Sequence, residues 1–351
     1  MEYLFLLSGE NIKLAAQEVL SLLNIKKYKL IRKLLFDDIE DSIDIDELTN
    51  RLALTKSIHK LLFQCNKKDL VNKIKNYGWN SVYKENFCVR IYRQKIFPQE
   101  KFYAKFSEKS IAGYIWGKIK NPKVNLDSPK TLINLFFNNE KVYCFLLLKN
   151  VSHDFEKRKS HLRPRPSPTS LHPRLARAMV NLTGIKDKNE TIADLFCGSG
   201  GIPLEAGLMG FKTVANDINK KMLWKTLVNL RYYTIKDYRL MNKDILKISE
   251  KFDYVVSDLP YGLNSSVYYK NSERKGKIKI KNNKKMIREL ENFYLKILMK
   301  LKKIVKKKIV LIFPHFVDYR KIIKKSGLKL KHDFGIYVHK SLTRRVVVLQ
   351  L

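Results

Sequence analysis

The second half of the chain alternates short apolar runs with stretches in which apolar residues recur at helical spacing. The apolar runs predict buried strands at 191–196, 212–217, 238–241, 252–256 and 309–313, with two further strands near 328–338 and 345–351. Helical spacing is clearest at 290–301 and at 317–325, and Gly327 ends the second of these helices. Regular alternation of strands and helices predicts an α/β domain built on a Rossmann-like, doubly wound sheet.

The first half of the chain has a less regular pattern. It predicts strands at 3–7, 87–92, 123–126 and 142–148, helices at 11–23 and 45–54, and a helical or connecting stretch at 113–119. Strands and helices that do not alternate one for one indicate an α+β region. Charges and prolines then accumulate between Ser152 and Pro173, which predicts a linker ahead of the α/β domain.

A glycine-rich segment joins the first predicted strand of the α/β domain to its first helix. Glycines let the backbone approach a ligand closely, so this turn can cradle a cofactor, although a similar turn can also be a simple connection. Pro203 stands where a dinucleotide-binding turn has its third glycine, which disfavours a nicotinamide enzyme. The segment is more similar to the first motif of class I methyltransferases, in which Asp194 faces the methionine end of S-adenosylmethionine. The residues of this segment that we expect at the cofactor are Asp194, Phe196, Cys197, Gly198, Gly200 and Gly201.

Two later acidic residues support a nucleoside cofactor. Asp217, followed by Ile218, ends the second predicted strand, where a carboxylate can accept hydrogen bonds from both ribose hydroxyls. Asp244, followed by Ile245, comes after the third predicted strand and can accept a hydrogen bond from the adenine amine. Asp244 is also suited to be the N-cap of a helix, and the sequence leaves both roles open.

The segment Asp258-Leu259-Pro260-Tyr261 follows a buried strand, at the sheet edge where open α/β folds bind ligands. The Asp258 carboxylate and the Leu259 carbonyl can each accept one N–H of an amine on an aromatic base, which directs its lone pair toward a methyl donor. Pro260 stiffens the turn, and the Tyr261 ring offers a stacking face. The expected catalysis works by alignment and electrostatics, with Asp258 as the late proton acceptor.

This segment is similar to the motif of amino-methyltransferases, an acid or Asn, a variable residue, Pro and an aromatic residue. Many members have Pro where this chain has Leu259, but this position contributes mainly its carbonyl, so we expect activity to survive the difference. A pyrimidine C5-methyltransferase would need a catalytic cysteine where Tyr261 stands, which argues against that chemistry.

The segments 163–182 and 337–344, together with the two motifs above, resemble the archaeal tRNA guanine N2-methyltransferases that act on guanosine 10. The resemblance implies S-adenosylmethionine as cofactor, tRNA as partner, and transfer of one and then a second methyl group to N2. It also implies that Thr169, Ser170 and the helix from Pro173 cover the cofactor. His172 and His339 are expected to be structural.

The resemblance and the patterns together predict four segments. These are a ferredoxin-like unit at 1–60, a THUMP-type RNA-binding domain at 61–150, a linker at 151–172 and a class I methyltransferase domain at 173–351.

Composition agrees with an RNA-binding enzyme. The chain has 70 Lys and Arg against 33 Asp and Glu, a net charge of +37 that attracts polyanions. Lys, Ile and Asn are all abundant, however, which suggests a bias toward AT-rich codons, so the charge is weak evidence by itself. The basic tract 270–285 predicts either a loop that orders over RNA or an ordinary solvated loop.

Four cysteines, at 65, 88, 144 and 197, lack close pairing and metal-ligand spacing, which favours a reducing cytoplasm and no structural metal. No apolar run is long enough to span a bilayer, and Glu2 precedes the apolar start, so we expect a soluble cytoplasmic protein without a membrane partner.

Three other functions stay open at this point. One is a guanine N2-methyltransferase that acts on another tRNA position or on rRNA, and another is DNA adenine N6 methylation, which the RNA-binding resemblance disfavours. The third is a non-catalytic RNA-binding protein with a methyltransferase fold, against which Asp194, Asp217 and Asp258 argue.

Overall fold

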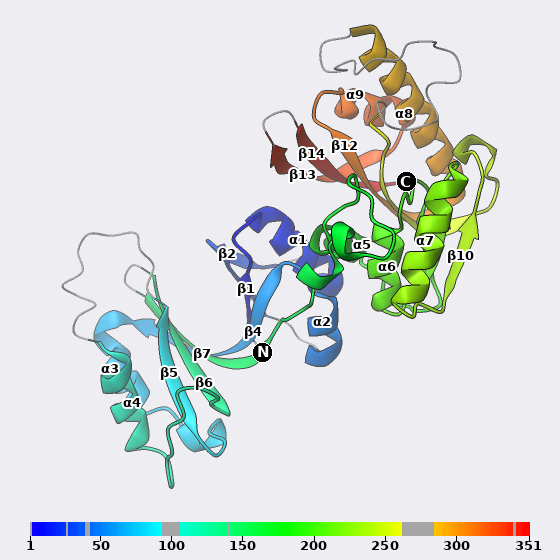
Figure 1. The fold of residues 1–351 in the computed structure, drawn as a ribbon. Helices are drawn as coiled ribbons and strands as arrows, with labels where there is room; N and C mark the ends of the chain where they lie inside the picture. Colours follow the sequence, from blue (N-terminus) through cyan, green and yellow to red (C-terminus); the bar gives the residue numbers. More distant parts are fainter. Residues whose placement is uncertain are drawn as a thin grey trace. The chain divides into compact units, whose positions relative to one another are not determined.

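The computed structural model describes residues 2–25, 27–38, 43–92, 106–138, 141–261, 284–339 and 342–351. They form two compact units that interleave along the sequence, each built on its own seven-stranded sheet (Figure 1). The first unit comprises Met1–Gly9, Ile25–Thr49 and Thr55–Ser152, and the second comprises Glu10–Asn24, Asn50–Leu54 and His153–Leu351. Most of the predicted basic loop at 270–285 lies outside the described residues.

The sheet of the first unit has the strand order β2-β3-β1-β4-β7-β6-β5. Its strands are β1 (Glu2–Leu7), β2 (Lys29–Ile31), β3 (Leu34–Asp38), β4 (Thr55–Asn66), β5 (Phe87–Tyr92), β6 (Thr131–Asn138) and β7 (Lys141–Asn150). Its helices include α3 (Leu70–Lys75) and α4 (Glu108–Trp116), and α2 (Ile45–Arg51) precedes β4. A buried cluster joins α3, α4 and the sheet through Leu70, Ile74, Ile111, Ile115, Phe87, Ile133 and Leu135.

The α+β character predicted for this region is confirmed, with differences in single elements. The strand predicted at 123–126 is wrong, because only an isolated bridge between Phe87 and Val124 forms there. Strands β2, β3, β4 and β6 were not predicted from the sequence. In β4 and β6 consecutive residues are buried, so side chains on both faces of the sheet are covered there and apolar and polar residues do not simply alternate.

The sheet of the second unit has the order β10-β9-β8-β11-β12-β14-β13. Its strands are β8 (Thr191–Asp194), β9 (Lys212–Asn216), β10 (Tyr238–Met241), β11 (Phe252–Asp258), β12 (Val305–Pro314), β13 (Lys329–His339) and β14 (Leu342–Gln350). The strands from β10 to β12 are parallel, and β14 pairs antiparallel with both β12 and β13. This is the predicted Rossmann-like sheet with a terminal antiparallel pair.

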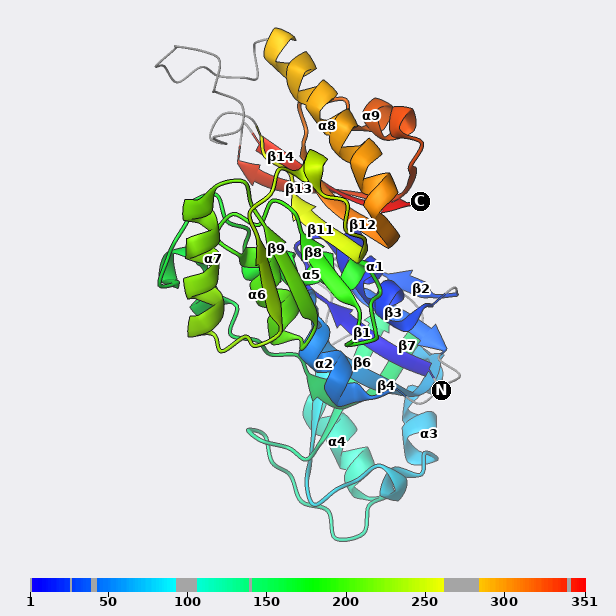
Figure 2. The same cartoon turned by 90° about the vertical axis from the view of Figure 1, so that its right-hand side faces the viewer.

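Helices cover both faces of this sheet (Figure 2). They are α5 (Pro173–Leu182), α6 (Gly201–Leu208), α7 (Lys220–Tyr232), α8 (Lys284–Ile304) and α9 (Tyr319–Ser326). Val214 packs in the core with α8 and α9, whereas the next residue, Ala215, packs against Leu223 of α7. Since neighbouring strand residues point to opposite faces, α7 and α8 lie on opposite sides of β9.

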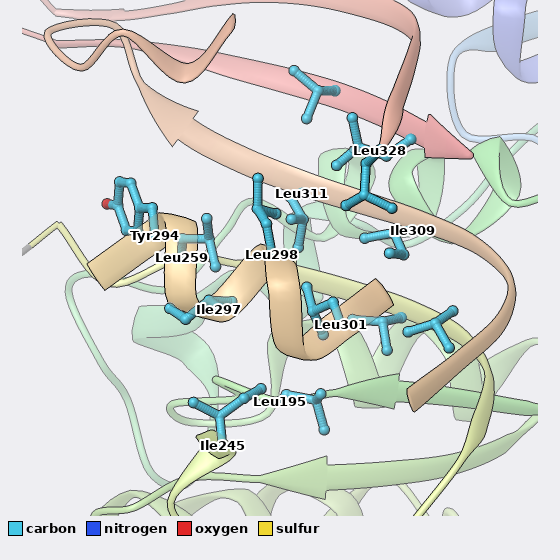
Figure 3. Packing of buried hydrophobic residues seen from close by; sticks show 14 of the residues in the cluster. Leu195, Ile245, Leu259, Tyr294, Ile297, Leu298, Leu301, Ile309, Leu311 and Leu328 are labelled. Atoms are coloured by element: carbon cyan, nitrogen blue, oxygen red, sulfur yellow. The ribbon is translucent and has the colours of Figure 1, made fainter. Parts of the chain in front are cut away.

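The core beneath α8 holds the sheet edge near the predicted motif. Figure 3 shows Tyr294, Ile297, Leu298 and Leu301 of α8 with Leu311 and Ile309 of β12 beside them. Leu259, the second residue of the motif, belongs to the same core and is 1% exposed.

Helix α1 (Ile12–Leu23) belongs to the second unit although it lies near the start of the chain. Its Glu18 is fully buried and accepts hydrogen bonds from the backbone N–H groups of Ala53 (2.9 Å) and Leu54 (2.8 Å). Glu18 also accepts one from Asn181 Nδ2 of α5 (2.7 Å). Burial raises the pKa of Glu18, and these hydrogen bonds oppose that shift. The second unit therefore includes two pieces of the first 54 residues.

Within the described residues, no helix combines the length and hydropathy needed to cross a bilayer. The same part of the chain holds no group of three or more His, Cys, Asp or Glu side chains arranged for a metal ion.

Candidate active site

The acidic residues singled out from the sequence gather along one edge of the second sheet. Asp194 ends β8, Asp217 follows β9, Asp244 follows β10 and Asp258 ends β11. These four strands are neighbours in the order β10-β9-β8-β11 and run parallel, so their carboxyl ends share an edge. The site is therefore a row of four carboxylates along this sheet edge, next to the glycine-rich turn that follows β8.

The glycine-rich turn leaves room for a ligand at one glycine and is closed by protein at another. Gly198 has φ +54°, and a Cβ there would meet no atom within 4 Å. Gly200 has φ +85°, and a Cβ there would lie 2.8 Å from Thr226 Cγ2. Thr226 also donates a hydrogen bond to the Gly198 carbonyl (2.9 Å), which fixes the turn against α7. Glycine adopts positive φ without strain at both positions, and the open side of Gly198 can receive a cofactor.

Asp217 supports this turn and keeps hydrogen-bonding capacity for a ligand. Its Oδ2 accepts from the Gly198 backbone N–H (2.9 Å), and its Oδ1 accepts from the Asn219 N–H (2.8 Å). Each carboxylate oxygen has a second lone pair, and the side chain is only partly buried. Burial raises its pKa, and the two backbone hydrogen bonds lower it. The adjacent Ile218 is 44% exposed and can pack against a ring.

Asp194 is buried and joins two strands. Its Oδ1 accepts hydrogen bonds from Ser257 Oγ of β11 (2.7 Å) and from the Phe196 N–H (3.2 Å). Ser257 in turn accepts from the Leu195 N–H (2.9 Å). Burial raises the pKa of Asp194 to about 7, and the nearby carboxylates Asp217 and Asp258 add to the rise. Cys197, also buried, has a raised pKa for the same reason, so it is a neutral thiol.

Asp244 caps a short 3-10 helix, Ile245–Lys247, by accepting from the Leu246 N–H (2.9 Å). Ile245 is 4% exposed and lies in the core. The capping role, one of the two that the sequence left open, is therefore present, and it uses only Oδ1. Asn216 positions this segment, because its Nδ2 donates to the Lys243 carbonyl (3.0 Å) and its Oδ1 accepts from the Lys243 N–H (3.0 Å).

The segment before α5 approaches the glycine turn. Ser170 Oγ would lie 3.1 Å from a Cβ at Gly201, and it accepts a hydrogen bond from Arg163 Nη1 (3.2 Å). Thr169 is hydrogen-bonded to Ser167 (3.2 Å between the hydroxyl oxygens). Residues of this segment, Ser170 among them, line a cavity of about 420 Å³. His172 is the N-cap of α5 and accepts from the Arg174 N–H (3.2 Å).

The four-residue motif is held by contacts from three other elements. Leu259 donates its N–H to the Ile312 carbonyl of β12 (3.3 Å). The Tyr294 hydroxyl of α8 donates to the Pro260 carbonyl (2.8 Å). The Tyr261 hydroxyl donates to Asp258 Oδ1 (2.6 Å) and accepts from Arg344 Nε of β14 (3.2 Å). The motif is thereby fixed to the sheet, to α8 and to the antiparallel strand pair.

Arg344 also lies close to the carboxylate itself, with 3.7 Å between its Nη2 and Asp258 Oδ2. Burial raises the pKa of Asp258 to about 6, while the Arg344 charge and the Tyr261 hydrogen bond lower it. The pKa of Tyr261 lies well above its ordinary value, because burial and the Asp258 charge both oppose its ionisation. Tyr261 therefore stays protonated and donates a hydrogen bond to the carboxylate.

Sequence reasoning missed the residues that support the motif, namely Ser257, Tyr294 and Arg344. Ser257 immediately precedes the motif but was given no role, Tyr294 was assigned to an apolar helix face, and Arg344 is 86 residues beyond Asp258 in the chain. Only the pairing of β14 with β12 brings Arg344 to the same sheet edge. The arrangement as a whole fits S-adenosylmethionine, since the turn is open at Gly198 and a partly exposed carboxylate lies beside it.

Comparisons with known proteins identify relatives of this chain. The model of the RMKL-like methyltransferase domain family matches residues 160–271. A tRNA (guanine(10)-N2)-dimethyltransferase of Methanothermobacter thermautotrophicus is 31% identical over 86% of this chain and 84% of its own length. The protein with the same name from Methanocaldococcus jannaschii is 29% identical over 98% of both chains.

The crystal structure of TrmN from Thermus thermophilus has a similar fold, with a TM-score of 0.51 at 16% identity over 100% of this chain and 99% of that one. The predicted fold class and the predicted cofactor, S-adenosylmethionine, are confirmed. The chain belongs to the tRNA (guanine(10)-N2)-dimethyltransferase family of S-adenosylmethionine-dependent enzymes.

Proposed function

We propose that this protein transfers methyl groups, one and then a second, to the exocyclic N2 of guanosine 10 in tRNA. The observation that carries the proposal is the Asp258 carboxylate, fixed at the same sheet edge as the glycine turn in a chain that belongs to this family. A carboxylate beside a methyl-donor site suits an amine whose N–H groups need an acceptor.

The mechanism assigns separate tasks to the motif residues. S-adenosylmethionine, when bound, supplies an electrophilic methyl group on its sulfonium sulfur. Asp258 Oδ1 already accepts from Tyr261, so Oδ2 is the oxygen that we assign to one N–H of guanine N2. The Leu259 carbonyl accepts the other N–H, and together they direct the nitrogen lone pair toward the methyl group. Asp258 then takes the proton that the nitrogen loses.

The same groups can serve the second transfer. Monomethylated N2 has a single N–H, so one acceptor is enough to orient it. The Tyr261 ring, whose hydroxyl is fixed between Asp258 and Arg344, provides a stacking face for the base. We assign cofactor contacts to the glycine turn, Asp217, Ile218, Asp244, Ile245, Thr169 and Ser170.

We further propose that the region before the linker captures the body of the tRNA, with a ferredoxin-like unit at 1–60, a THUMP-type domain at 61–150 and a linker at 151–172. Guanosine 10 is paired in folded tRNA, so it has to be extruded at a cost of about a few kcal/mol. Contacts elsewhere on the RNA must offset that cost.

A tRNA transcript with inosine at position 10 tests the proposal, because inosine lacks only the exocyclic amine. The protein should convert guanosine 10 of the normal transcript to N2-methyl and then N2,N2-dimethylguanosine, detected by mass spectrometry of nuclease fragments. It should add no methyl group to the inosine transcript. Equal methylation of both transcripts would refute the assignment to position 10, and N2-methylguanosine at another position would refute the position while retaining the chemistry.

A further inference from the structure

Helix α7 carries a basic and aromatic surface that the catalytic mechanism does not use. Its 13 residues include four Lys or Arg and no Asp or Glu. One face is buried through Leu223, Thr226, Asn229 and Leu230. On the other side, Trp224 is 48% exposed and Tyr232 is 64% exposed. We define the α7 surface as Arg165, Lys221, Trp224, Lys225, Arg231 and Tyr232.

The linker is fixed onto this helix by its own hydrogen bonds. Asn229 accepts from the Arg165 N–H and donates to the Arg165 carbonyl, both at 3.0 Å. Lys225 Nζ donates to the Pro166 carbonyl (2.9 Å). This places the Arg165 guanidinium 4.3 Å from the centre of the Trp224 ring. The stacked Arg165 guanidinium thus orients the Trp224 ring, although the Trp224 side chain remains about half exposed.

The spacing of the exposed rings suits a polynucleotide. Residues 224 and 232 are eight positions apart and lie on one side of the helix, roughly 12 Å apart along its axis. Lys221 and Arg231 are exposed near the two ends of this stripe, and no described carboxylate forms an ion pair with either. Aromatic faces that receive bases, interleaved with cations that receive phosphates, are the pattern of single-stranded nucleic-acid sites.

The position of α7 connects the surface to the reaction. The helix begins at Lys220, three residues after Asp217, at the sheet edge that holds the active-site carboxylates (Figure 2). RNA whose target base enters at that edge has its neighbouring nucleotides within reach of the first turn of α7. An acidic protein would satisfy the cations but would leave the two exposed rings without planar partners.

We propose that the α7 surface is an RNA-contact surface of the methyltransferase unit itself, on which a base of the tRNA stacks on Trp224 while phosphates contact Lys221 and Arg231. The inference rests on tRNA being the substrate, as proposed above. It adds RNA binding outside the four-residue motif to the unit that carries out the chemistry.

Tryptophan fluorescence tests direct contact. The chain has three tryptophans, of which Trp79 is 1% exposed and Trp116 is 47% exposed. In the full-length Trp116→Phe protein, Trp224 is the exposed emitter, and addition of tRNA without cofactor should quench it. Trp224→Ala should weaken tRNA binding by about 5- to 150-fold, the range for loss of one stacked base. Trp224→Phe, which keeps a ring, should retain most of the affinity.

Charge variants test the phosphate contacts. Lys221→Gln should lower the salt dependence of tRNA binding by about 0.7 to 0.9 in the logarithmic slope for each lost phosphate contact. Lys296→Gln, an exposed lysine of α8 on the other face of the sheet, is the matched control and should leave the slope unchanged. In Lys221→Gln the KM for tRNA should rise more than kcat falls, whereas Lys296→Gln should leave both unchanged.

The outcomes separate this inference from the proposed function. Unquenched Trp224 and unchanged affinity of Trp224→Ala, with normal methylation by the wild type, would overturn the α7 surface alone. Quenching with no methylated guanosine formed would overturn the proposed function but keep the surface. Dissociation of a dimer by Trp224→Ala in sedimentation, without loss of RNA affinity, would identify the surface as a contact between copies of the chain and overturn the RNA assignment.

Discussion

Replacement of Arg344 by methionine should shift the pH dependence of methyl transfer. Among the described residues, Arg344 is the cation that pairs with Asp258, with 3.7 Å between Nη2 and Oδ2, and the two side chains are 15% and 20% exposed. Asp258 must be ionised to accept from the amine and to take the proton, so activity should rise with pH through its pKa, which is about 6 in the wild type. Loss of the Arg344 charge disfavours the ionised form of Asp258, raises its pKa and moves the rise in activity to higher pH.

The size of the shift follows from the distance. A charge pair at 3.7 Å interacts with about 4 kcal/mol at an effective dielectric constant of about 20, and solvent at this partly exposed site reduces that value. About 2 kcal/mol corresponds to about 1.5 pKa units. The acidic limb should then move from about pH 6 to between about 7 and 8, so kcat at pH 7 should fall several-fold and recover near pH 9.

The groups that act on Asp258 define the controls. They are Arg344 of β14, Tyr261 in its own turn, and Asp194 of β8, whose interaction with Asp258 raises the pKa of Asp194. Arg345→Met removes the same charge one residue away, where the side chain pairs with Asp333 (2.6 Å), and should leave the limb in place. Arg344→Lys keeps a positive charge and should move the limb part of the way back to its wild-type position.

The assay is single-turnover transfer of labelled methyl groups at saturating tRNA and cofactor between pH 5 and 9. At saturating concentrations, a change in RNA affinity caused by a substitution does not affect the measured rate. If the limbs of Arg344→Met and Arg345→Met coincide with that of the wild type, Arg344 does not control the ionisation of the catalytic carboxylate and the reasoning fails.

Three further variants test the division of labour. Asp258→Ala should abolish transfer but leave tRNA affinity nearly intact, because the amine is the only part of the RNA that we assign to this carboxylate; parallel loss of binding, measured by filter retention, would refute that role. Asp217→Ala should weaken S-adenosylmethionine binding by about 1 to 3 kcal/mol through unpaired ribose hydroxyls, and calorimetry with unchanged affinity would remove it from the site. Glu18→Ala leaves three buried donors without an acceptor, so chemical denaturation should show that the free energy of unfolding falls by about 2 to 4 kcal/mol. A fall below about 0.5 kcal/mol would show that the Glu18 contacts of α1 are dispensable for the unit.

The Glu18 contacts also decide whether a truncated protein can test tRNA capture by the region before the linker. A fragment that begins near Ser160 lacks α1 and Asn50–Leu54, so Asn181 of α5 loses its partner. Such a fragment is expected to be unstable for a reason unrelated to RNA. The proposed capture of tRNA by the region before the linker is better tested by substitutions of exposed Lys in the first unit, followed by tRNA binding of the full chain.

Local patterns in the sequence were sufficient for the parts of the molecule in which function depends on adjacent residues. The strand, glycine turn and helix from Thr191 to Leu208 follow from an apolar run, glycines that adopt positive φ and a tolerated Pro203. The placement of Asp194, Asp217 and Asp258 at one edge also follows, because parallel strands align their carboxyl ends.

Tertiary structure decided what depends on residues far apart in the chain. The sequence left Asp244 between a cap and an adenine contact, and only the fold shows the cap. It gave no sign that Arg344 lies beside Asp258, because strand pairing is set by the whole sheet and not by either segment. Likewise Glu18 fixes α1 to the second unit through hydrogen bonds to residues 35 or more positions away. The hydrophobic periodicity of α1 does not indicate these contacts. Local preferences choose the elements, whereas burial and long-range hydrogen bonds choose their neighbours.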